Sequence, residues 1–305
     1  MPETFATPID AITRYCAVYG HPIKHSASPA MQNAGIAALG LNWRYLAFDV
    51  HPSQLKTALE GARAARFVGI NLTVPHKLLA MDFVDVLDDS AKVWGAVNTV
   101  RFEGRNEQNQ WQPIGEFVDV PDEVRSQGFN TDADAIAQAL EEDLNVQFRG
   151  ASVFLLGAGG AGRTAALKIA SRNIAQLFLF NRTESKAQSV RDEITQRYPA
   201  VKVTIGYPAG EVDLVLNATS LGLKPADPLP FNKAKFSLSR AKAVYDMIYR
   251  PAETTLLQMA RSVGCKTANG MGMLLYQGAK ALELWTGQTP PIEVMRRALE
   301  QEVRK

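Results

Sequence analysis

The sequence predicts an α/β protein, and three observations bear on this prediction. Short apolar runs alternate with helical patterns over most of the chain, which is typical of a mainly parallel sheet covered by helices. The length of 305 residues allows one large domain or two medium ones. The hydrophobic share of 46% and the charged share of 21% are those of an ordinary globular protein, so a disordered chain is excluded.

The first third of the chain carries four runs that predict strands, at residues 15–20, 43–50, 67–74 and 97–102. The segments between them place apolar residues at a spacing near 3.6 and predict helices. Residues 103–127 break this alternation, because they are polar and acidic and contain two prolines. We expect a surface excursion or an extended hairpin there.

The remaining chain resumes the alternation with a helix at 132–144 and a buried strand at 151–156. That strand leads into a glycine-rich turn and a further helix. Later strands are expected at 177–180, 201–205, 212–217 and 242–247, and later helices at 254–264, 271–286 and 291–304. Gly264 is expected to end the first of these late helices.

Composition points to a small-molecule partner. The 33 basic residues nearly balance the 31 acidic ones, so the chain has no electrostatic footprint for nucleic acid. No apolar run reaches the roughly 20 residues that span a bilayer, and the N-terminus has no signal-peptide pattern. Cys16 and Cys265 form neither a disulfide framework nor a metal cluster, so we expect no metal and a reducing, cytoplasmic compartment.

The turn Gly157-Ala158-Gly159-Gly160-Ala161-Gly162 follows a strand and opens a helix, the context of a dinucleotide-binding site. Gly157 permits the tight turn, Gly159 lets the backbone approach a pyrophosphate, and Gly162 allows close packing of helix on strand. The helix N-terminus attracts the phosphates. The alternative is a purely structural turn.

The next strand indicates which dinucleotide binds. It ends in Asn181-Arg182-Thr183 with Lys186 one turn later, and it lacks the acidic residue that holds an NAD ribose. Two cations suit the 2′-phosphate of NADP, although they could also be solvated residues at a helix start. Residues Asn217-Ala218-Thr219-Ser220 follow another strand and are expected to form a wall of the cofactor site.

Candidate substrate residues gather at the ends of the early strands. Ser26 and Ser28 could face the same way and cradle a carboxylate, or Ser28 could be a helix cap before Pro29. Asn71, Thr73 and Lys77 end one strand, where ligands of α/β sheets collect, and a lysine there can be a general acid or base. Asn98 ends the run AVNT, and Asp132 opens a helix, where it could equally be an ordinary cap.

Together these segments resemble the shikimate dehydrogenase family. The matching motifs occur in the family's order between about residues 15 and 280: Ser26–Pro29, Asn71–Lys77, Ala96–Thr99, Asn130–Asp132, Gly157–Gly162, Asn181–Thr183, Asn217–Ser220, Asp246–Tyr249 and Gly270–Gln277. The segment 103–127 is longer than the family's usual connection.

The resemblance implies a mainly parallel substrate domain, residues 1–131 with 271–305, and a Rossmann-like NADP-binding domain, residues 132–270. The C-terminal helices would return to the first domain, with the substrate in the cleft between the two. It further implies that 3-dehydroshikimate is reduced to shikimate with NADPH, a step of aromatic amino-acid biosynthesis on the way to chorismate.

The resemblance also implies residue roles. Lys77 and Asp132 would be the catalytic pair. Ser26 and Ser28 would bind the substrate carboxylate, with Tyr249 beside it, and the ring hydroxyls would be held by Asn71, Thr73, Asn98, Asp132 and Gln277. Met247 and Gly270 would border the nicotinamide. A lysine beside a carboxylate suits this reaction, because hydride reaching a carbonyl leaves negative charge on oxygen that an ammonium group can stabilise and protonate.

Three alternatives stay open. The chain could be a quinate or quinate/shikimate dehydrogenase using NAD or NADP, or an enzyme of an aminoshikimate pathway. A non-catalytic NADP sensor on the same scaffold is the alternative from another class, although the presence of both Lys77 and Asp132 favours an enzyme. A monomer and a homodimer are both compatible with the sequence.

Overall fold

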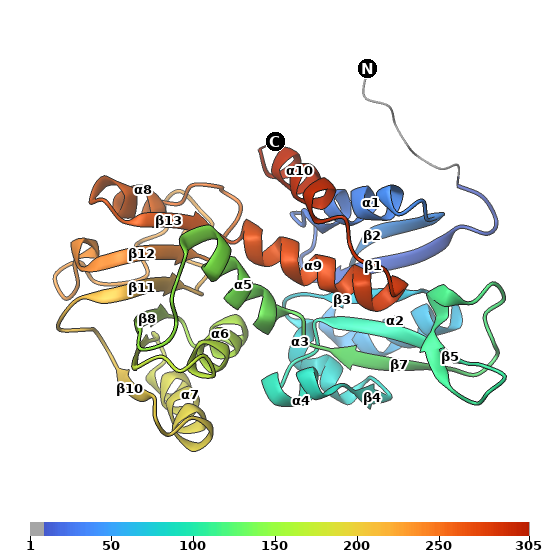
Figure 1. The fold of residues 1–305 in the computed structure, drawn as a ribbon, viewed down its shortest axis with the longest axis horizontal. Coiled ribbons are helices and arrows are strands. Elements are labelled where there is room, and N and C mark those ends of the chain that lie inside the picture. The colour runs from blue at the N-terminus through green and yellow to red at the C-terminus, as the bar shows by residue number, and fades with distance from the viewer. Residues whose placement is uncertain (1–8, 305) are drawn as a thin grey trace. The chain divides into compact units, whose positions relative to one another are not determined.

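The computed structural model describes residues 9–304, which form two compact units (Figure 1). The first unit runs to Asp132 and takes in Leu275–Val303, and the second is Ala133–Leu274. The expected absence of a signal peptide rests largely on residues 1–8, which lie outside the described part of the chain.

The first unit is built on a sheet of seven strands in the order β2-β1-β3-β5-β7-β4, with β6 paired to β5. β1, β2 and β3 are parallel, as expected, and β4 is parallel to β7. β5 enters antiparallel to β3 and pairs antiparallel with β6 and β7. The strands are β1 (Arg14–Gly20), β2 (Trp43–Asp49), β3 (Gly69–Leu72), β4 (Val86–Leu87), β5 (Thr99–Arg105), β6 (Trp111–Pro113) and β7 (Val124–Phe129).

The long segment after β5 is an extended hairpin, one of the two forms expected for it. β5 continues to Arg105 and turns back into β6, whose Trp111 lies opposite Arg105. Trp111 is covered by the guanidinium of Arg125, at 4.3 Å from the ring centroid. The hairpin base is tied to β1, because the guanidinium of Arg14 donates to the carbonyl oxygens of Ile114 and Val118.

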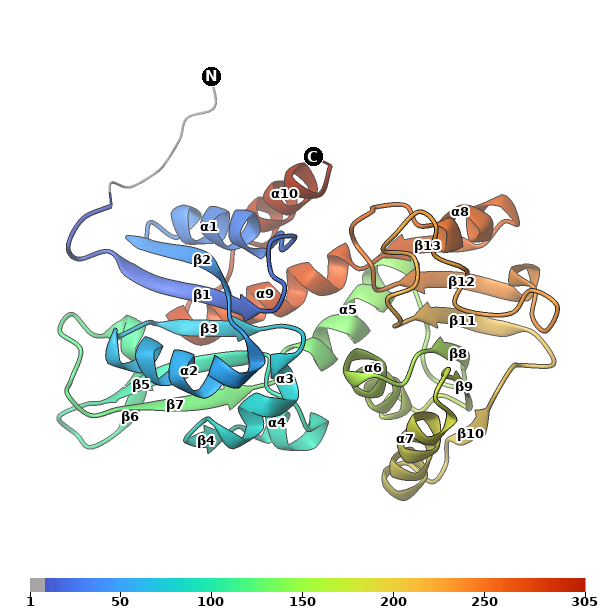
Figure 2. The ribbon, with the colours of Figure 1, turned by 180° about the vertical axis from the view of Figure 1, so that it is seen from behind.

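Helices cover both faces of this sheet. α2 (Leu55–Ala64) and α4 (Asp89–Trp94) share a hydrophobic cluster with Ala17, Ile70 and Val100 on one face (Figure 2). The other face carries α1 (Ser28–Ala38), α9 (Met271–Thr286) and α10 (Ile292–Val303). Trp285 of α9 lies so close to β3 that a Cβ on Gly69 would approach its ring to 2.0 Å, so this close approach requires glycine.

The second unit contains a sheet of six strands in the order β10-β9-β8-β11-β12-β13, and all of its pairings are parallel. The chain starts at the centre with β8, moves outward to β10 and returns to β11 beside β8. The reversal between β8 and β11 is the position where α/β sheets of this kind bind ligands. The strands are β8 (Ser152–Leu156), β9 (Gln176–Phe180), β10 (Lys202–Ile205), β11 (Val212–Asn217), β12 (Ala241–Asp246) and β13 (Lys266–Asn269).

The second unit also packs helices against its sheet. Its helices are α5 (Asp132–Leu144), α6 (Gly160–Ala170), α7 (Glu184–Arg197) and α8 (Thr255–Ser262). α6 and α7 contact β8, β9 and β10, whereas α8 contacts β12 and β13. Gly264 has a φ of 87° just after α8, which agrees with its expected role in ending that helix. The α/β class is therefore confirmed, although the strands β4, β6, β7 and β13 had no counterpart among the predicted strands.

No helix within residues 9–304 combines the length and the apolar character needed to cross a membrane.

Candidate active site

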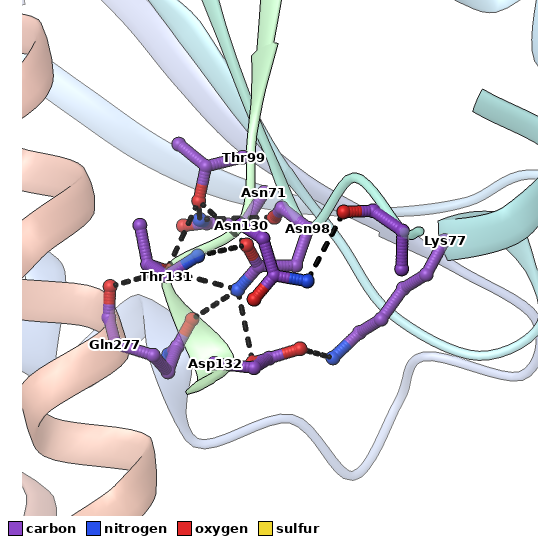
Figure 3. A network of polar contacts seen from close by, with 9 residues as sticks. Asn71, Lys77, Asn98, Thr99, Asn130, Thr131, Asp132 and Gln277 are labelled. Atoms are coloured by element: carbon purple, nitrogen blue, oxygen red, sulfur yellow. Dashed lines mark hydrogen bonds and ion pairs between the residues drawn. The ribbon is translucent and has the colours of Figure 1, made fainter. Parts of the chain in front are cut away.

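A polar cluster lies at one edge of the first sheet, where three strands bring distant segments together (Figure 3). Asn71 of β3 pairs with Thr99 of β5, and Thr99 pairs with Phe129 of β7. Because β5 is antiparallel to both neighbours, its first residue lies beside their last residues. Thr131 and Asp132, which follow β7, therefore contact Asn98 at this edge, and Asn98 in turn contacts Asn71.

Lys77 and Asp132 form the ion pair at the centre of this cluster. Lys77 belongs to the short helix α3 (His76–Leu79), and its Nζ donates to Asp132 Oδ2 at 2.6 Å (Figure 3). The Asp132 side chain is 9% exposed and the Lys77 side chain is 29% exposed. The pair thus leaves the ammonium group reachable while the carboxylate is held inside the protein.

Asn98 fixes the other oxygen of that carboxylate. Its Nδ2 donates to Asp132 Oδ1 and to Thr131 Oγ1, each at 2.9 Å, and lies 3.5 Å from Gln277 Oε1. Its Oδ1 accepts from the backbone N–H of Thr131 at 2.7 Å. Thr131 also donates through Oγ1 to the carbonyl of Gln277 on α9. The sequence analysis did not select Thr131, although its neighbour Asp132 was a candidate.

Asn71 is buried in the same cluster. Its Nδ2 donates to Thr99 Oγ1 at 3.0 Å and lies 3.4 Å from the carbonyl oxygen of Asn98, and its Oδ1 accepts from the hydroxyl of Tyr45 at 2.9 Å. Thr73 follows at the end of the strand, is partly exposed, and is anchored by its backbone N–H to Tyr19. Tyr45 was missed by the sequence analysis because it lies 26 residues away on β2.

The two candidate serines lie at the start of α1. The backbone N–H of Ser28 donates to Ser26 Oγ at 3.3 Å, which holds the Ser26 side chain against the start of this helix. Ser28 is the first helical residue, Ala27 is at the cap position, and no side chain forms a cap hydrogen bond there. The interpretation of Ser28 as a helix cap is therefore wrong.

The glycine-rich turn of the second unit has the geometry that a pyrophosphate requires. Gly157 has a φ of 108°, and a Cβ on Gly162 would lie 2.2 Å from the Gly157 carbonyl oxygen, so neither position accommodates a side chain without strain. Around Gly159 and Gly160 an added Cβ would meet nothing within 4 Å. The open space above the N-terminus of α6 is suited to a phosphate group.

The turn is held by its neighbours. Asn181 Oδ1 accepts from the backbone N–H of Ala158 at 3.0 Å, and Asn181 Nδ2 donates to the carbonyl of Thr183. Segment 217–220 lies against the turn, since a Cβ on Gly157 would approach the Ala218 carbonyl oxygen to 2.9 Å. Asn217 accepts from the backbone and the hydroxyl of Thr219.

Next to segment 217–220 lies a buried carboxyl group to which the sequence analysis did not assign a role. Asp246 accepts from Asn217 Nδ2, from the hydroxyl of Thr254 and from the N–H of Ile248. Burial raises the pKa of Asp246, and its hydrogen bonds with Thr254, Ile248 and Asn217 oppose that effect. Its position ties together the ends of β11 and β12.

Met247, Tyr249 and Gly270 also belong to the second unit. A Cβ on Gly270 would lie 2.0 Å from the Met247 carbonyl oxygen, so these two residues are in close contact. Tyr249 is partly exposed on the same loop after β12.

A cavity of about 670 Å³ opens at the end of β9. Arg182 lines it, together with Lys235 and Tyr207, which the sequence analysis missed. The Tyr207 ring lies 4.8 Å from the ring of Phe180, and the Lys235 ammonium lies 5.6 Å from the Tyr207 ring. Lys186 is exposed on α7 and is not among the described residues that line the cavity. The cavity is thus an aromatic-walled pocket with two cations and one carboxylate, Glu184, and its lining residue Asn181 contacts the glycine-rich turn.

Among residues 9–304, no group of three or more His, Cys, Asp or Glu side chains could hold a metal ion.

Comparison with known proteins places these features in one family. Family models match residues 18–100 (shikimate dehydrogenase substrate binding domain), 138–223 (shikimate/quinate 5-dehydrogenase) and 270–300 (shikimate 5′-dehydrogenase C-terminal domain). A shikimate dehydrogenase (NADP⁺) from Methanopyrus kandleri is 37% identical over 303 residues, covering 97% of this chain and 98% of the relative.

Solved structures agree. Shikimate 5-dehydrogenase from Thermus thermophilus, crystallised with NADP(H) and shikimate, has a TM-score of 0.78 at 33% identity, covering 95% of this chain and 99% of its own. Two other similar structures are of proteins that are named for different activities. They are a 5-ketofructose reductase of Gluconobacter (TM-score 0.77, 30% identity, 96% and 99% coverage) and a quinate dehydrogenase from Corynebacterium glutamicum in complex with NAD (TM-score 0.78, 28% identity, 95% and 99% coverage).

Proposed function

The chain belongs to the shikimate dehydrogenase family, and on this premise we propose that it interconverts 3-dehydroshikimate and shikimate with NADP. The observation that carries the proposal is the contact between Lys77 and Asp132, which joins an ammonium group and a carboxylate 55 residues apart. A non-catalytic sensor has no need of such a pair inside a network of side-chain amides.

The residues of the first unit supply the proton chemistry. Reduction of 3-dehydroshikimate brings a hydride to the carbonyl carbon and a proton to its oxygen, and NADPH held by the second unit would supply the hydride. The ammonium group of Lys77 stabilises the negative charge that develops on that oxygen and donates its proton to it, because Nζ is the partly exposed end of the pair. Asp132, held by Asn98, orients Lys77 and accepts a hydrogen bond from a ring hydroxyl.

The proposed substrate site uses groups that can bind a polyhydroxylated ring acid. Ser26 and Ser28, linked at the start of α1 by a hydrogen bond from the Ser28 backbone to Ser26 Oγ, carry hydroxyls suited to the carboxylate, and Tyr249 is assigned beside it. The ring hydroxyls are assigned to Asn71, Thr73, Asn98, Asp132 and Gln277. All of these except Tyr249 belong to the first unit, which we assign as the substrate-binding domain.

The second unit is assigned as the NADP-binding domain. The residues proposed to hold NADP are Gly157–Gly162, Asn181–Thr183, Asn217–Ser220, Met247 and Gly270. Arg182 at the cavity supplies planar donors for a 2′-phosphate, and no carboxylate follows β9 at the position that binds an NAD ribose. Lys186 is retained as an outer cation that adds to the field.

The proposed reaction belongs to aromatic amino-acid biosynthesis. Cys16 and Cys265 are unpaired, which is compatible with a reducing, cytoplasmic compartment. The assembly compatible with the sequence is a monomer or a homodimer.

The test is turnover of purified protein with shikimate, quinate and 5-ketofructose, each with NADP and with NAD, followed by nicotinamide absorbance. We expect the highest kcat/KM for shikimate with NADP, and Lys77→Ala to lower kcat by more than about 100-fold with a smaller effect on KM. A higher kcat/KM with quinate or with NAD would favour the quinate dehydrogenase alternative. An unchanged kcat in Lys77→Ala would remove Lys77 from the mechanism.

A further inference from the structure

Tyr45 is a buried tyrosine whose backbone, ring and hydroxyl each contact other residues. The sequence analysis did not assign it to the site. It lies on β2 and is fully buried. Asn33 of α1 clamps its backbone, since Asn33 Oδ1 accepts from the Tyr45 N–H and Asn33 Nδ2 donates to the Tyr45 carbonyl, each at 2.9 Å. Its ring centroid lies 6.1 Å from that of Trp285. These contacts hold the Tyr45 hydroxyl in one position.

In this position the Tyr45 hydroxyl contacts the carboxamide of Asn71. Tyr45 Oη donates to Asn71 Oδ1 at 2.9 Å, across the intervening strand β1. Burial raises the pKa of the Tyr45 hydroxyl well above its ordinary value, Cys16 adds to this rise and Ser28 opposes it, so the hydroxyl keeps the proton that it donates to Asn71. The Tyr45 hydroxyl thus contacts a side chain that we assign to the substrate.

The hydrogen bonds of the Asn71 side chain show how the contact with Tyr45 affects its orientation. An asparagine side chain has two N–H donors and two oxygen lone pairs. Both donors point at oxygen atoms of the protein, on Thr99 and Asn98, and Tyr45 occupies one lone pair. One lone pair is left. The reversed carboxamide would place its oxygen against the carbonyl oxygen of Asn98, which is repulsive.

We propose that Tyr45 is a positioning residue whose hydroxyl locks the Asn71 carboxamide, so that Asn71 offers an oxygen acceptor to a donating hydroxyl of the substrate. The inference rests on the proposed function, because it assumes a hydroxylated substrate at Asn71. Tyr45 thus contributes to substrate affinity without contacting the substrate itself. The Lys77–Asp132 pair is not involved in this contribution.

The test is Tyr45→Phe, which removes one oxygen and keeps the ring against Trp285. We expect KM for shikimate to rise about fivefold to tenfold, the value of one hydrogen bond in a buried site, with kcat within about twofold of wild type. Tyr19→Phe is the matched control, because Tyr19 is a buried tyrosine on β1 that packs in the cluster on the opposite face of the sheet. Its KM should stay at the wild-type value.

A double-mutant cycle separates positioning from a general loss of structure. In an Asn71→Ala background, Tyr45→Phe should add no further change in KM. An unchanged KM in Tyr45→Phe, the same fold increase in the Asn71→Ala background, or an equal increase in Tyr19→Phe would each overturn the proposal. Wild-type turnover of shikimate tests the proposed function separately, and if quinate proves the better substrate the same ratios are measured with quinate.

Discussion

Replacing Asp132 by asparagine tests the acid–base pair with the smallest possible change of shape. The carboxylate accepts from two donors at once, Lys77 Nζ on one oxygen and Asn98 Nδ2 on the other. An asparagine side chain has only one oxygen, so in either orientation its NH₂ group faces one of these donors. The variant therefore loses one hydrogen bond as well as the charge that orients Lys77.

The expected size follows from these two losses. A lost hydrogen bond to a charged group costs about 1.5–3 kcal/mol, which corresponds to roughly 10- to 150-fold in rate when it is made in the transition state. Loss of positioned acid–base catalysis is typically about 10²- to 10⁴-fold. The two overlap, because both act on the same ammonium group, so we expect kcat to fall about 10²- to 10⁴-fold.

The assay is steady-state oxidation of shikimate at saturating NADP, with the unfolding temperature measured alongside. Asp134→Asn is the matched control, since Asp134 is exposed two residues later on the same helix and pairs with Lys168 instead. It should keep wild-type kcat. A kcat of Asp132→Asn within about threefold of wild type, in a folded protein, would refute the catalytic role given to the pair.

Two further predictions concern the cofactor and the pH dependence of stability. Arg182→Ala should raise KM for NADP about 10- to 100-fold and leave KM for NAD unchanged, with Lys186→Ala as the milder control; equal losses for both cofactors would contradict recognition of a 2′-phosphate. Burial lowers the pKa of His76 below 6.5, while Val50 and Asp49 oppose this and His21 adds to it. Below about pH 6.5 the unfolded chain therefore binds a proton at His76 that the folded protein does not bind. The free energy of unfolding falls as the pH drops through this range. The unfolding temperature of His76→Asn should fall less than that of wild type between about pH 7.5 and pH 5.5, and parallel curves would exclude this role.

Features determined by short stretches of sequence could be predicted. The glycine-rich turn is one, because Gly157 is required by its own φ of 108° and Gly162 by the Gly157 carbonyl oxygen five residues earlier. The hairpin after β5 and the helix end at Gly264 are others. In each case the residue types themselves decide the backbone conformation, so no knowledge of distant partners is needed.

Features that depend on strand register could not be predicted. Tyr45 reaches Asn71 because β1 separates their strands and both side chains face α9, and no spacing in the sequence records that register. Lys235 reaches the cavity from a segment 53 residues beyond Arg182. Both residues look unremarkable in sequence, and only tertiary packing gives them a role.

The direction of β5 explains why the site forms at this edge. Asn98 immediately precedes β5, whereas Asn71 lies near the end of β3 and Thr131 just after β7. In an all-parallel sheet Asn98 would lie at the opposite edge, about 20 Å away across the seven residues of β5. The reversal brings it beside Asn71 and lets its amide hold Asp132 opposite Lys77. The departure from parallel pairing, which the sequence did not predict, is thus what assembles the proposed catalytic pair and its supporting amides.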